Sequence, residues 1–260
     1  MTQHAKDSIA AYRQSHDEVL RQLTEFGDSE LLAQSGAAEW TVAQVLSHLG
    51  SSSEIALATL RAGAANPAGN QAIWNRWDAL PPAMQAAEFL TWELRLVEGL
   101  EALSEADLHG MRLDLGFMPW PVDIATFTDM RLSEVAHHRW DIDVAFDAKA
   151  VLKSYLVPAV LDLAPMLAGF SARPIGKTGP VVVHTSAPTR TYLLEVTVDG
   201  CSVSELGDDP APDGATTAHM PAESFARLTA GRLSAEHTPS GVDVEGPVSL
   251  DDLRTLFPGF

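Results

Sequence analysis

Apolar side chains recur at a helical period near the start of the chain. Within residues 7–26 these positions are Ile9, Tyr12, Val19, Leu20 and Leu23. A spacing close to 3.6 residues places them along one face of a helix. The segment therefore predicts an amphipathic helix.

A second helix is predicted within residues 39–63. Thr41 and Gln44 stand three residues apart, which is the spacing of a capping box at a helix N-terminus. Gly63 is suited to end the helix, because glycine adopts the left-handed conformation common after the last helical turn.

Two more helices complete the first half of the chain. Residues 81–103 open on two prolines, which fit a first helical turn, and another helix is expected within residues 120–146. Residues 64–80 are rich in Ala, Asn, Pro and Gly and predict a loop. Four helices of this length, joined by loops, predict a four-helix bundle.

The pattern changes after about residue 147. Short β-branched segments bounded by Gly, Pro and Asp predict strands and turns, and two helical patterns follow them. The strand segments are residues 179–186, 190–206 and 242–248, and the helical ones are 221–233 and 249–257. The fold class predicted is α plus α+β, with a bundle over residues 1–149 and a small α+β domain over residues 150–260.

The net charge of the chain argues against some classes of binding partner. The chain has 17 Lys and Arg against 35 Asp and Glu, a net charge of −18, which repels nucleic-acid phosphates and anionic lipid. We find no signal-peptide pattern and no apolar run of the roughly 18 residues that span a bilayer, so we expect a cytoplasmic protein. Cys201 is the sole cysteine, which excludes an internal disulfide and an all-cysteine metal site.

Candidate chemistry gathers in the fourth predicted helix. Glu134 and His138 are four residues apart, so their side chains project from one helix face. At about 100° per residue, Asp141 falls within roughly 20° of Glu134. This face is either a solvated or salt-bridged helix surface or part of a metal site.

A third candidate ligand is His48, in the second predicted helix. Val42, Val45, Leu46 and Leu49 surround it at helical spacing. With Glu134 and His138 it makes a His₂Glu set, which is the ligand count of catalytic zinc centres with one open position. The alternative is a hydrogen-bonded histidine of the helix core.

The two segments together resemble the mycothiol-dependent maleylpyruvate isomerase family, a branch of the DinB-like metal-binding four-helix bundles. The family has a Trp-Thr-hydrophobic helix start followed by His, and then Arg-x-x-Glu-x-x-x-His-x-x-Asp in its fourth helix. The matching positions are Trp40, Thr41, His48, Arg131, Glu134, His138 and Asp141, with every spacing kept. Residues 220–257 are similar to the family's small, sterol-carrier-like C-terminal domain.

The resemblance implies that His48, Glu134 and His138 hold Zn²⁺ or another divalent metal. It also implies mycothiol as the thiol cosubstrate, deprotonated by zinc to a zinc thiolate. In isomerase members the thiolate adds to a cis double bond of a small electrophile and leaves after rotation, giving the trans product. In S-transferase members it stays attached.

Three other residues have candidate roles. Asp141 either orients a metal ligand or accepts a proton near the thiol, and the alternative is a surface salt bridge. Helix geometry allows His137 in place of His138, but the family register favours His138. Arg76, in the predicted loop, and Arg232, in the Gly-Arg of the C-terminal domain, are candidates for binding substrate carboxylates, against the alternative of surface arginines.

Two other functions fit the same residues. One is a thiol-independent metal hydrolase, and the other is a non-catalytic binding or regulatory module stabilised by its metal. A monomer is expected, because the second domain can cover the open end of the bundle.

Overall fold

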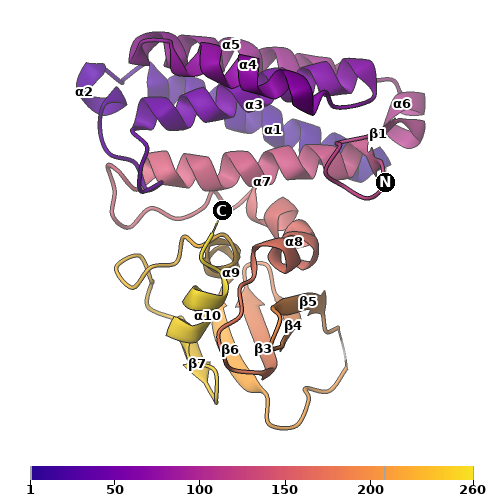
Figure 1. Cartoon of the computed structure of the whole chain (residues 1–260), viewed down its shortest axis with the longest axis vertical. Coiled ribbons are helices and arrows are strands. Elements are labelled where there is room, and N and C mark those ends of the chain that lie inside the picture. The colour runs from indigo at the N-terminus through magenta and orange to yellow at the C-terminus, as the bar shows by residue number, and fades with distance from the viewer. Residues whose placement is uncertain (1, 208, 260) are drawn as a thin grey trace. The chain divides into compact units, whose positions relative to one another are not determined.

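The computed structural model describes residues 2–207 and 209–259, and the chain divides into two compact units, residues 1–147 and 148–260. The first unit is helical and the second is built around a β-sheet (Figure 1). This mixture confirms the fold class predicted from the sequence. Among the described residues, no helix is both long enough and apolar enough to cross a membrane.

Four long helices form the first unit. They are α1 (Thr2–Leu23), α3 (Val42–Ala62), α5 (Pro82–Glu101) and α7 (Ile124–Asp143). Helix α1 packs against α5 and α7, and α3 packs against the same two helices, which closes a four-helix bundle (Figure 1). Short elements join them: α2 (Asp28–Leu31), α4 (Pro67–Asp78), α6 (Glu105–Gly110) and the antiparallel pair β1 (Arg112–Leu113) and β2 (Val122–Asp123).

The ends of α3 are fixed by the residues that predicted them. The Thr41 side chain accepts from the Gln44 backbone N–H at 3.3 Å, and the Gln44 side chain accepts from the Thr41 N–H at 2.8 Å. Gly63 ends the helix in the left-handed conformation, with φ of 77°. Both signals act locally along the chain, which is why the sequence reveals them.

The prediction of a loop over residues 64–80 is wrong, because Pro67–Asp78 forms helix α4. Its buried anchor is Trp77, which is 2% exposed. A Cβ on Gly50 of α3 would lie 2.2 Å from the Trp77 ring, so the absent side chain of Gly50 makes room for the indole. Helix α4 is therefore stabilised by packing on α3, which a local composition of Ala, Asn and Gly does not reveal.

The loop that precedes α3 lies against the end of α7. The Gly36 N–H donates to the Asp141 carbonyl at 2.7 Å. A Cβ on Gly36 would lie 2.6 Å from Val144 Cγ1 and 3.2 Å from the Asp141 Cα. Glycine thus allows the loop to approach α7 closely, directly before Trp40 and α3.

The second unit contains a five-stranded sheet in the order β5-β4-β3-β6-β7, with β3 and β6 parallel and the other neighbours antiparallel. Helix α8 contacts α9 and β5, and α9 contacts β3 and β6. The strands are β3 (Gly179–Ser186), β4 (Arg190–Val196), β5 (Cys201–Glu205), β6 (Thr216–Pro221) and β7 (Asp243–Glu245), and the helices are α8 (Val157–Ser171), α9 (Ala222–Thr229) and α10 (Leu250–Leu256). The sequence pattern located all of these elements except α8 and β6.

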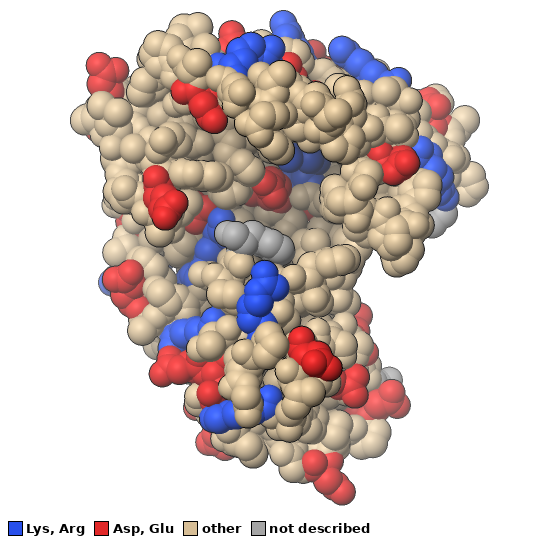
Figure 2. Space-filling view, in the orientation of Figure 1, with Lys and Arg blue, Asp and Glu red and all other residues tan. Residues whose placement is uncertain are grey.

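Charged side chains of both signs are interspersed over the visible face of each unit (Figure 2). Several acidic groups are paired, including Glu101 with Arg13 and Asp252 with Lys177. The expectation that nucleic acid and membranes are not partners stays a prediction from the net charge.

Candidate metal centre

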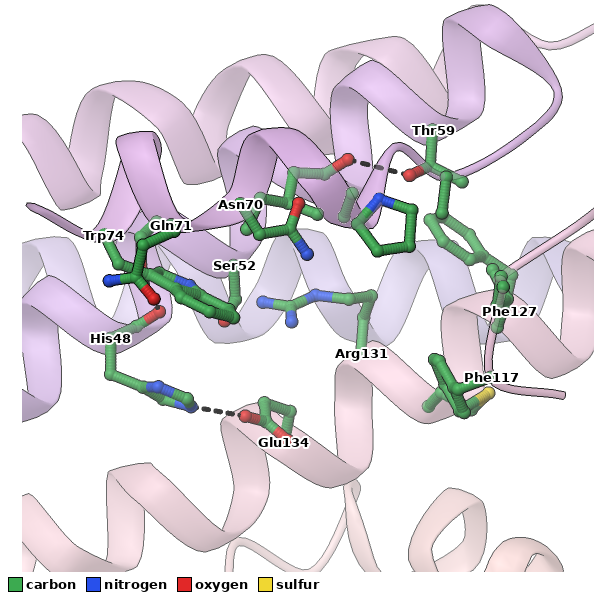
Figure 3. A pocket seen from close by; sticks show the side chains of 18 of the residues that line it. His48, Ser52, Thr59, Asn70, Gln71, Trp74, Phe117, Phe127, Arg131 and Glu134 are labelled. Carbon is green, nitrogen blue, oxygen red and sulfur yellow. Dashed lines mark hydrogen bonds and ion pairs between the residues drawn. The ribbon is translucent and has the colours of Figure 1, made fainter.

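His48 and Glu134 face each other between α3 and α7. Nε2 of His48 lies 2.6 Å from Oε1 of Glu134, as Figure 3 shows at one end of a pocket. The two residues are 86 positions apart in sequence, and the packing of α3 against α7 brings them together.

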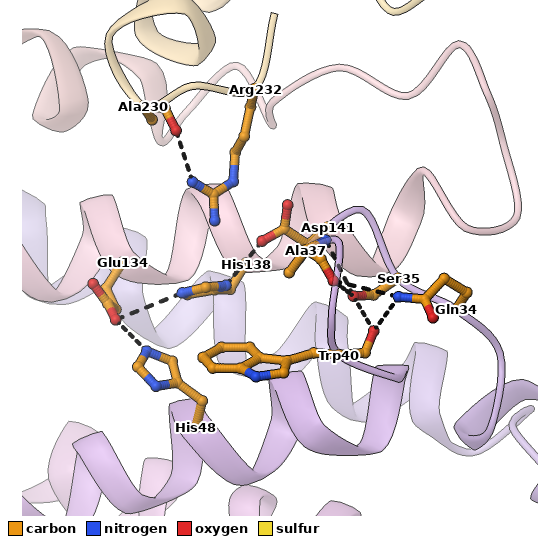
Figure 4. A network of polar contacts seen from close by, with 10 residues as sticks. All are labelled: Gln34, Ser35, Ala37, Trp40, His48, Glu134, His138, Asp141, Ala230 and Arg232. Atoms are coloured by element: carbon orange, nitrogen blue, oxygen red, sulfur yellow. Dashed lines mark hydrogen bonds and ion pairs between the residues drawn. The ribbon is translucent and has the colours of Figure 1, made fainter. Parts of the chain in front are cut away.

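His138 completes the cluster from the next turn of α7. Its Nε2 lies 3.7 Å from the same Glu134 oxygen, and the His48 and His138 rings are 4.7 Å apart in an edge-on arrangement (Figure 4). One ligand atom from each of the three residues lies within 4.8 Å of the other two. The structure thus gathers the three residues that the sequence nominated as metal ligands.

The spacing fits a single divalent ion. Ligand atoms about 2.1 Å from a tetrahedral metal are about 3.4 Å apart. The 3.7 Å separation is close to this value, and the 2.6 Å contact between His48 and Glu134 needs to open by less than about 1 Å. Two imidazole nitrogens and one carboxylate oxygen are a donor set typical of catalytic zinc sites.

Asp141 determines which nitrogen of His138 faces this cluster. Its Oδ2 lies 2.9 Å from His138 Nδ1, and its side chain is fully buried. A carboxylate at this position accepts the Nδ1 proton, so the Nε2 lone pair is directed toward Glu134. Asp141 therefore occupies the position of a ligand-orienting group, which is one of the roles considered from the sequence.

The indole of Trp40 lies along the two histidines. Its ring centroid is 5.0 Å from that of His48 and 6.0 Å from that of His138 (Figure 4). The Trp40 carbonyl accepts from Ser35 Oγ at 2.7 Å and from Gln34 Nε2 at 2.9 Å, which holds the preceding loop closed. Trp40 thus covers one side of the cluster with an apolar surface.

The surroundings keep Glu134 ionised. Burial alone would raise the pKa of its carboxyl group, but the hydrogen bond with His48 and the nearby His138 and Arg131 side chains hold that pKa well below its usual range. An ionised carboxylate is the form that binds a cation.

A pocket of about 940 Å³ opens beside the cluster, lined by α3, α4, α7 and residues 115–117. His48 and Glu134 lie at one end of it, and Phe117 and Phe127 lie at the other (Figure 3). Asn70 and Gln71 of α4 contribute amide groups to the wall. Helix α4, missed from the sequence, is therefore a wall of this pocket.

Arg131 is a pocket residue to which the sequence analysis gave no role. It lies one turn before Glu134, is 9% exposed and lines the pocket. Burial alone would lower the pKa of its guanidinium, but Tyr12 and Glu134 keep that pKa above its usual value. Its place in the family motif, three residues before Glu134, was the available signal.

The two arginines nominated from the sequence belong to other elements of the chain. Arg76 is on α4 rather than in a loop, and its guanidinium pairs with Glu54. It is absent from the described residues that line the pocket, so the structure does not bring it to the metal cluster. Arg232 is in the second unit, where Nη1 donates to the Ala230 carbonyl at 3.0 Å. Substrate binding by either arginine stays a prediction.

His137 and Cys201 are not among the three residues of the cluster. His137 is buried on α7 and is not part of the metal-ligand group formed by its neighbour His138. Cys201 begins β5 in the second unit, and burial, aided by Glu195, raises the pKa of its thiol to about 12. Cys201 is therefore protonated at neutral pH.

Comparison with known proteins identifies the family. The family model described as mycothiol maleylpyruvate isomerase N-terminal domain matches residues 12–143. Similar solved structures include a crystal structure of the mycothiol-dependent maleylpyruvate isomerase and one of its histidine-to-alanine mutant. Each is 16% identical to this chain, with a TM-score of 0.64 over 94% of this chain and 95% of the other, a likeness that establishes the fold. No curated protein matches the sequence. The matched segment covers more than half of the 260 residues and includes the whole metal-ligand cluster, so this chain belongs to the mycothiol maleylpyruvate isomerase family.

Proposed function

We propose that His48, Glu134 and His138 bind one divalent metal ion, expected to be zinc. The observation that carries this proposal is the convergence of their three ligand atoms within 4.8 Å, with Asp141 behind His138. Three protein ligands leave a position open, which is the arrangement of a catalytic rather than a structural zinc site.

The chain is further proposed to be a mycothiol-using enzyme, and membership of the family supports this activity. A bound zinc ion would lower the pKa of a thiol so that it is ionised at neutral pH. The reaction is proposed to be cis–trans isomerisation of a small electrophile, or transfer of the thiol to it. The raised pKa of Cys201 supports an external thiol, because the chain's own thiol is protonated at neutral pH.

The residues of the chain have separate tasks in this proposal. Asp141 holds the proton on Nδ1 of His138, so that Nε2 is free to bind the metal. Trp40 packs on both histidines and excludes water from one side of them. The adjacent pocket, of about 940 Å³, is large enough for a small electrophile beside the thiol.

The first test is metal content and thiol binding. Purified protein is expected to contain one zinc per chain, and the zinc-loaded protein is expected to bind mycothiol in calorimetric titration. His138→Ala should lose both properties. His109→Ala, an exposed histidine on α6, is the matched control and should retain them.

The outcome also separates the alternatives. Wild-type protein without stoichiometric metal, with His48→Ala unchanged in metal content, would contradict the proposal. Turnover of an electrophile without added thiol would instead select metal-assisted hydrolysis. Cytoplasmic location and a monomeric state stay predictions from the sequence.

A further inference from the structure

Arg131 places a buried positive charge in the wall of the pocket. Its side chain extends from α7 toward Ser52 of α3 and lines the pocket (Figure 3). Among the described residues that line the pocket it is the sole lysine or arginine. The chain has a net charge of −18, so this positive group in the pocket wall contrasts with the negative charge of the protein as a whole.

Few of the N–H donors of the Arg131 guanidinium have hydrogen-bond partners within the protein. Nη2 makes a long contact of 3.4 Å with Ser53 Oγ, the buried Tyr12 hydroxyl is a second polar neighbour, and the buried Nε has no protein partner. The guanidinium forms no ion pair with any carboxylate among the described residues, although Glu134 is one turn away. A guanidinium has five N–H donors, and leaving them unpaired in a buried position costs free energy.

A purely structural role explains these contacts poorly. A buried arginine that stabilises a fold is normally paired with a carboxylate in bidentate geometry. Glu93 of α5 is buried nearby and contributes to the charge balance, but its Oε2 contacts His16 at 3.3 Å and its Oε1 has no hydrogen-bond partner, so it is not paired with Arg131 in bidentate geometry. The unpaired donors of Arg131 instead match a planar anion entering from the pocket.

We infer that Arg131 is the residue that binds a carboxylate of the electrophilic substrate in this pocket. The inference rests on the proposed function and adds a specificity-determining residue to it. Arg131 and Glu134 are three residues apart on one helix, about 4.5 Å along its axis. A short unsaturated acid held at Arg131 therefore presents its double bond beside the metal cluster.

The remaining pocket wall suits such a ligand. Ile55, Phe127 and Met130 provide apolar surface for a short carbon chain, and Asn70 and Gln71 provide amide donors for a second polar group. Positioning by a fixed guanidinium would orient the double bond for thiol addition, which lowers the entropic part of the barrier.

The test uses maleate and its neutral isostere maleamide as probes. Both are titrated into metal-free full-length protein, so that a carboxylate cannot bind a metal ion instead. Wild-type protein should bind maleate and not maleamide. Arg131→Met should weaken maleate binding roughly 10- to 100-fold, as expected when a charged hydrogen-bond partner is removed from a buried site. Arg95→Met removes an exposed arginine stacked on Trp92 and should leave binding unchanged.

Two further measurements keep the inference testable if Arg131→Met folds poorly. Arg131→Lys retains the charge without the planar fork and should bind maleate more weakly than wild type but better than the Met variant. The maleate and maleamide comparison on wild type needs no variant at all. Circular dichroism and thermal unfolding establish which variants are folded.

The outcomes distinguish this inference from the proposed function. Equal binding of maleate and maleamide, no binding of maleate to wild type, or full binding by folded Arg131→Met would each overturn the role of Arg131. Absence of stoichiometric zinc, with Arg131-dependent maleate binding intact, would overturn the metal proposal and leave the carboxylate site standing.

Discussion

Asp141 and His138 form a buried pair on successive turns of α7, with Oδ2 of the aspartate 2.9 Å from Nδ1 of the histidine. The aspartate side chain is fully buried, whereas His138 is 12% exposed toward the cluster. The pair therefore connects the buried side of α7 to the edge of the histidine that faces Glu134. Its geometry fixes the ring orientation before any metal binds.

Asp141→Asn is predicted to weaken zinc binding by about 10- to 100-fold, the usual cost of losing such a partner. Asparagine is close in size and can still accept from Nδ1, but it lacks the negative charge that makes Nε2 a stronger ligand. Competition with a chromophoric chelator measures the affinity. Asp129→Asn is the matched control, because Asp129 is a buried acid on the same helix that accepts from Ser8 at 2.6 Å. Equal weakening by both variants would show a general effect of α7 stability.

The three residues of the candidate cluster could be nominated from the sequence because the helix signals around each of them are local. Glu134 and His138 share one helix face by periodicity alone, and the capping box at Thr41 locates the helix that carries His48. Their convergence across 86 residues required a helix pairing, which the family resemblance supplied. The pairing of the two helices was therefore predicted from the family motif, and hydrophobic periodicity alone would not have predicted it.

The pocket was not predictable for a physical reason. Helix α4 has weak periodicity, and it forms because Gly50 leaves space for Trp77 and because Glu54 accepts from the Trp77 indole N–H at 2.8 Å. Both contacts are tertiary. The state of Arg131 likewise depends on which side chains surround it from other helices, and its sequence neighbours do not reveal that.

Gly50→Ala is predicted to destabilise the first unit by about 1–3 kcal/mol, the typical cost of overpacking a core. The new methyl group would lie 2.2 Å from the Trp77 ring and 3.0 Å from the Phe89 backbone, so α4 or α5 must shift. Urea unfolding monitored by circular dichroism measures the change. Gly169→Ala in α8 has nothing within 4 Å of the added carbon and should be neutral or stabilising. A neutral Gly50→Ala would contradict the packing assigned to α4.

The pH dependence of the second unit is predicted to include a contribution from Asp252. Lys177 and the hydroxyl and N–H of Ser249 lower the pKa of this carboxyl to about 2. Because the folded pKa lies below the ordinary value of 3.8, the contribution is fully present above about pH 4. It is lost as pH falls from there through about 2.

Asp252→Asn tests this contribution. The variant should be less stable than wild type by about 1 kcal/mol at pH 7, a magnitude typical of a helix N-cap interaction. The difference should shrink as pH falls toward 2, where wild-type Asp252 is half protonated, and should approach zero below that pH. Denaturant titrations at several pH values measure it, and Asp199→Asn, on an exposed turn, is the control. A difference that is constant with pH would contradict the assignment.

Cys201 is predicted to react slowly with alkylating agents and to be dispensable for activity. Its thiol is partly buried and donates to the Ser202 carbonyl at 3.2 Å, and its pKa is raised to about 12. Because the thiolate is the reactive form and a free cysteine has a pKa near 8.5, iodoacetamide at pH 8 should modify Cys201 at least about 100-fold more slowly than free cysteine. Unfolding in urea should restore the fast rate. Cys201→Ser should retain thiol-dependent turnover in full, because the reacting sulfur is proposed to come from the cosubstrate. Rapid labelling of the folded protein, or loss of turnover in a folded Cys201→Ser variant, would show instead that the chain supplies its own thiol.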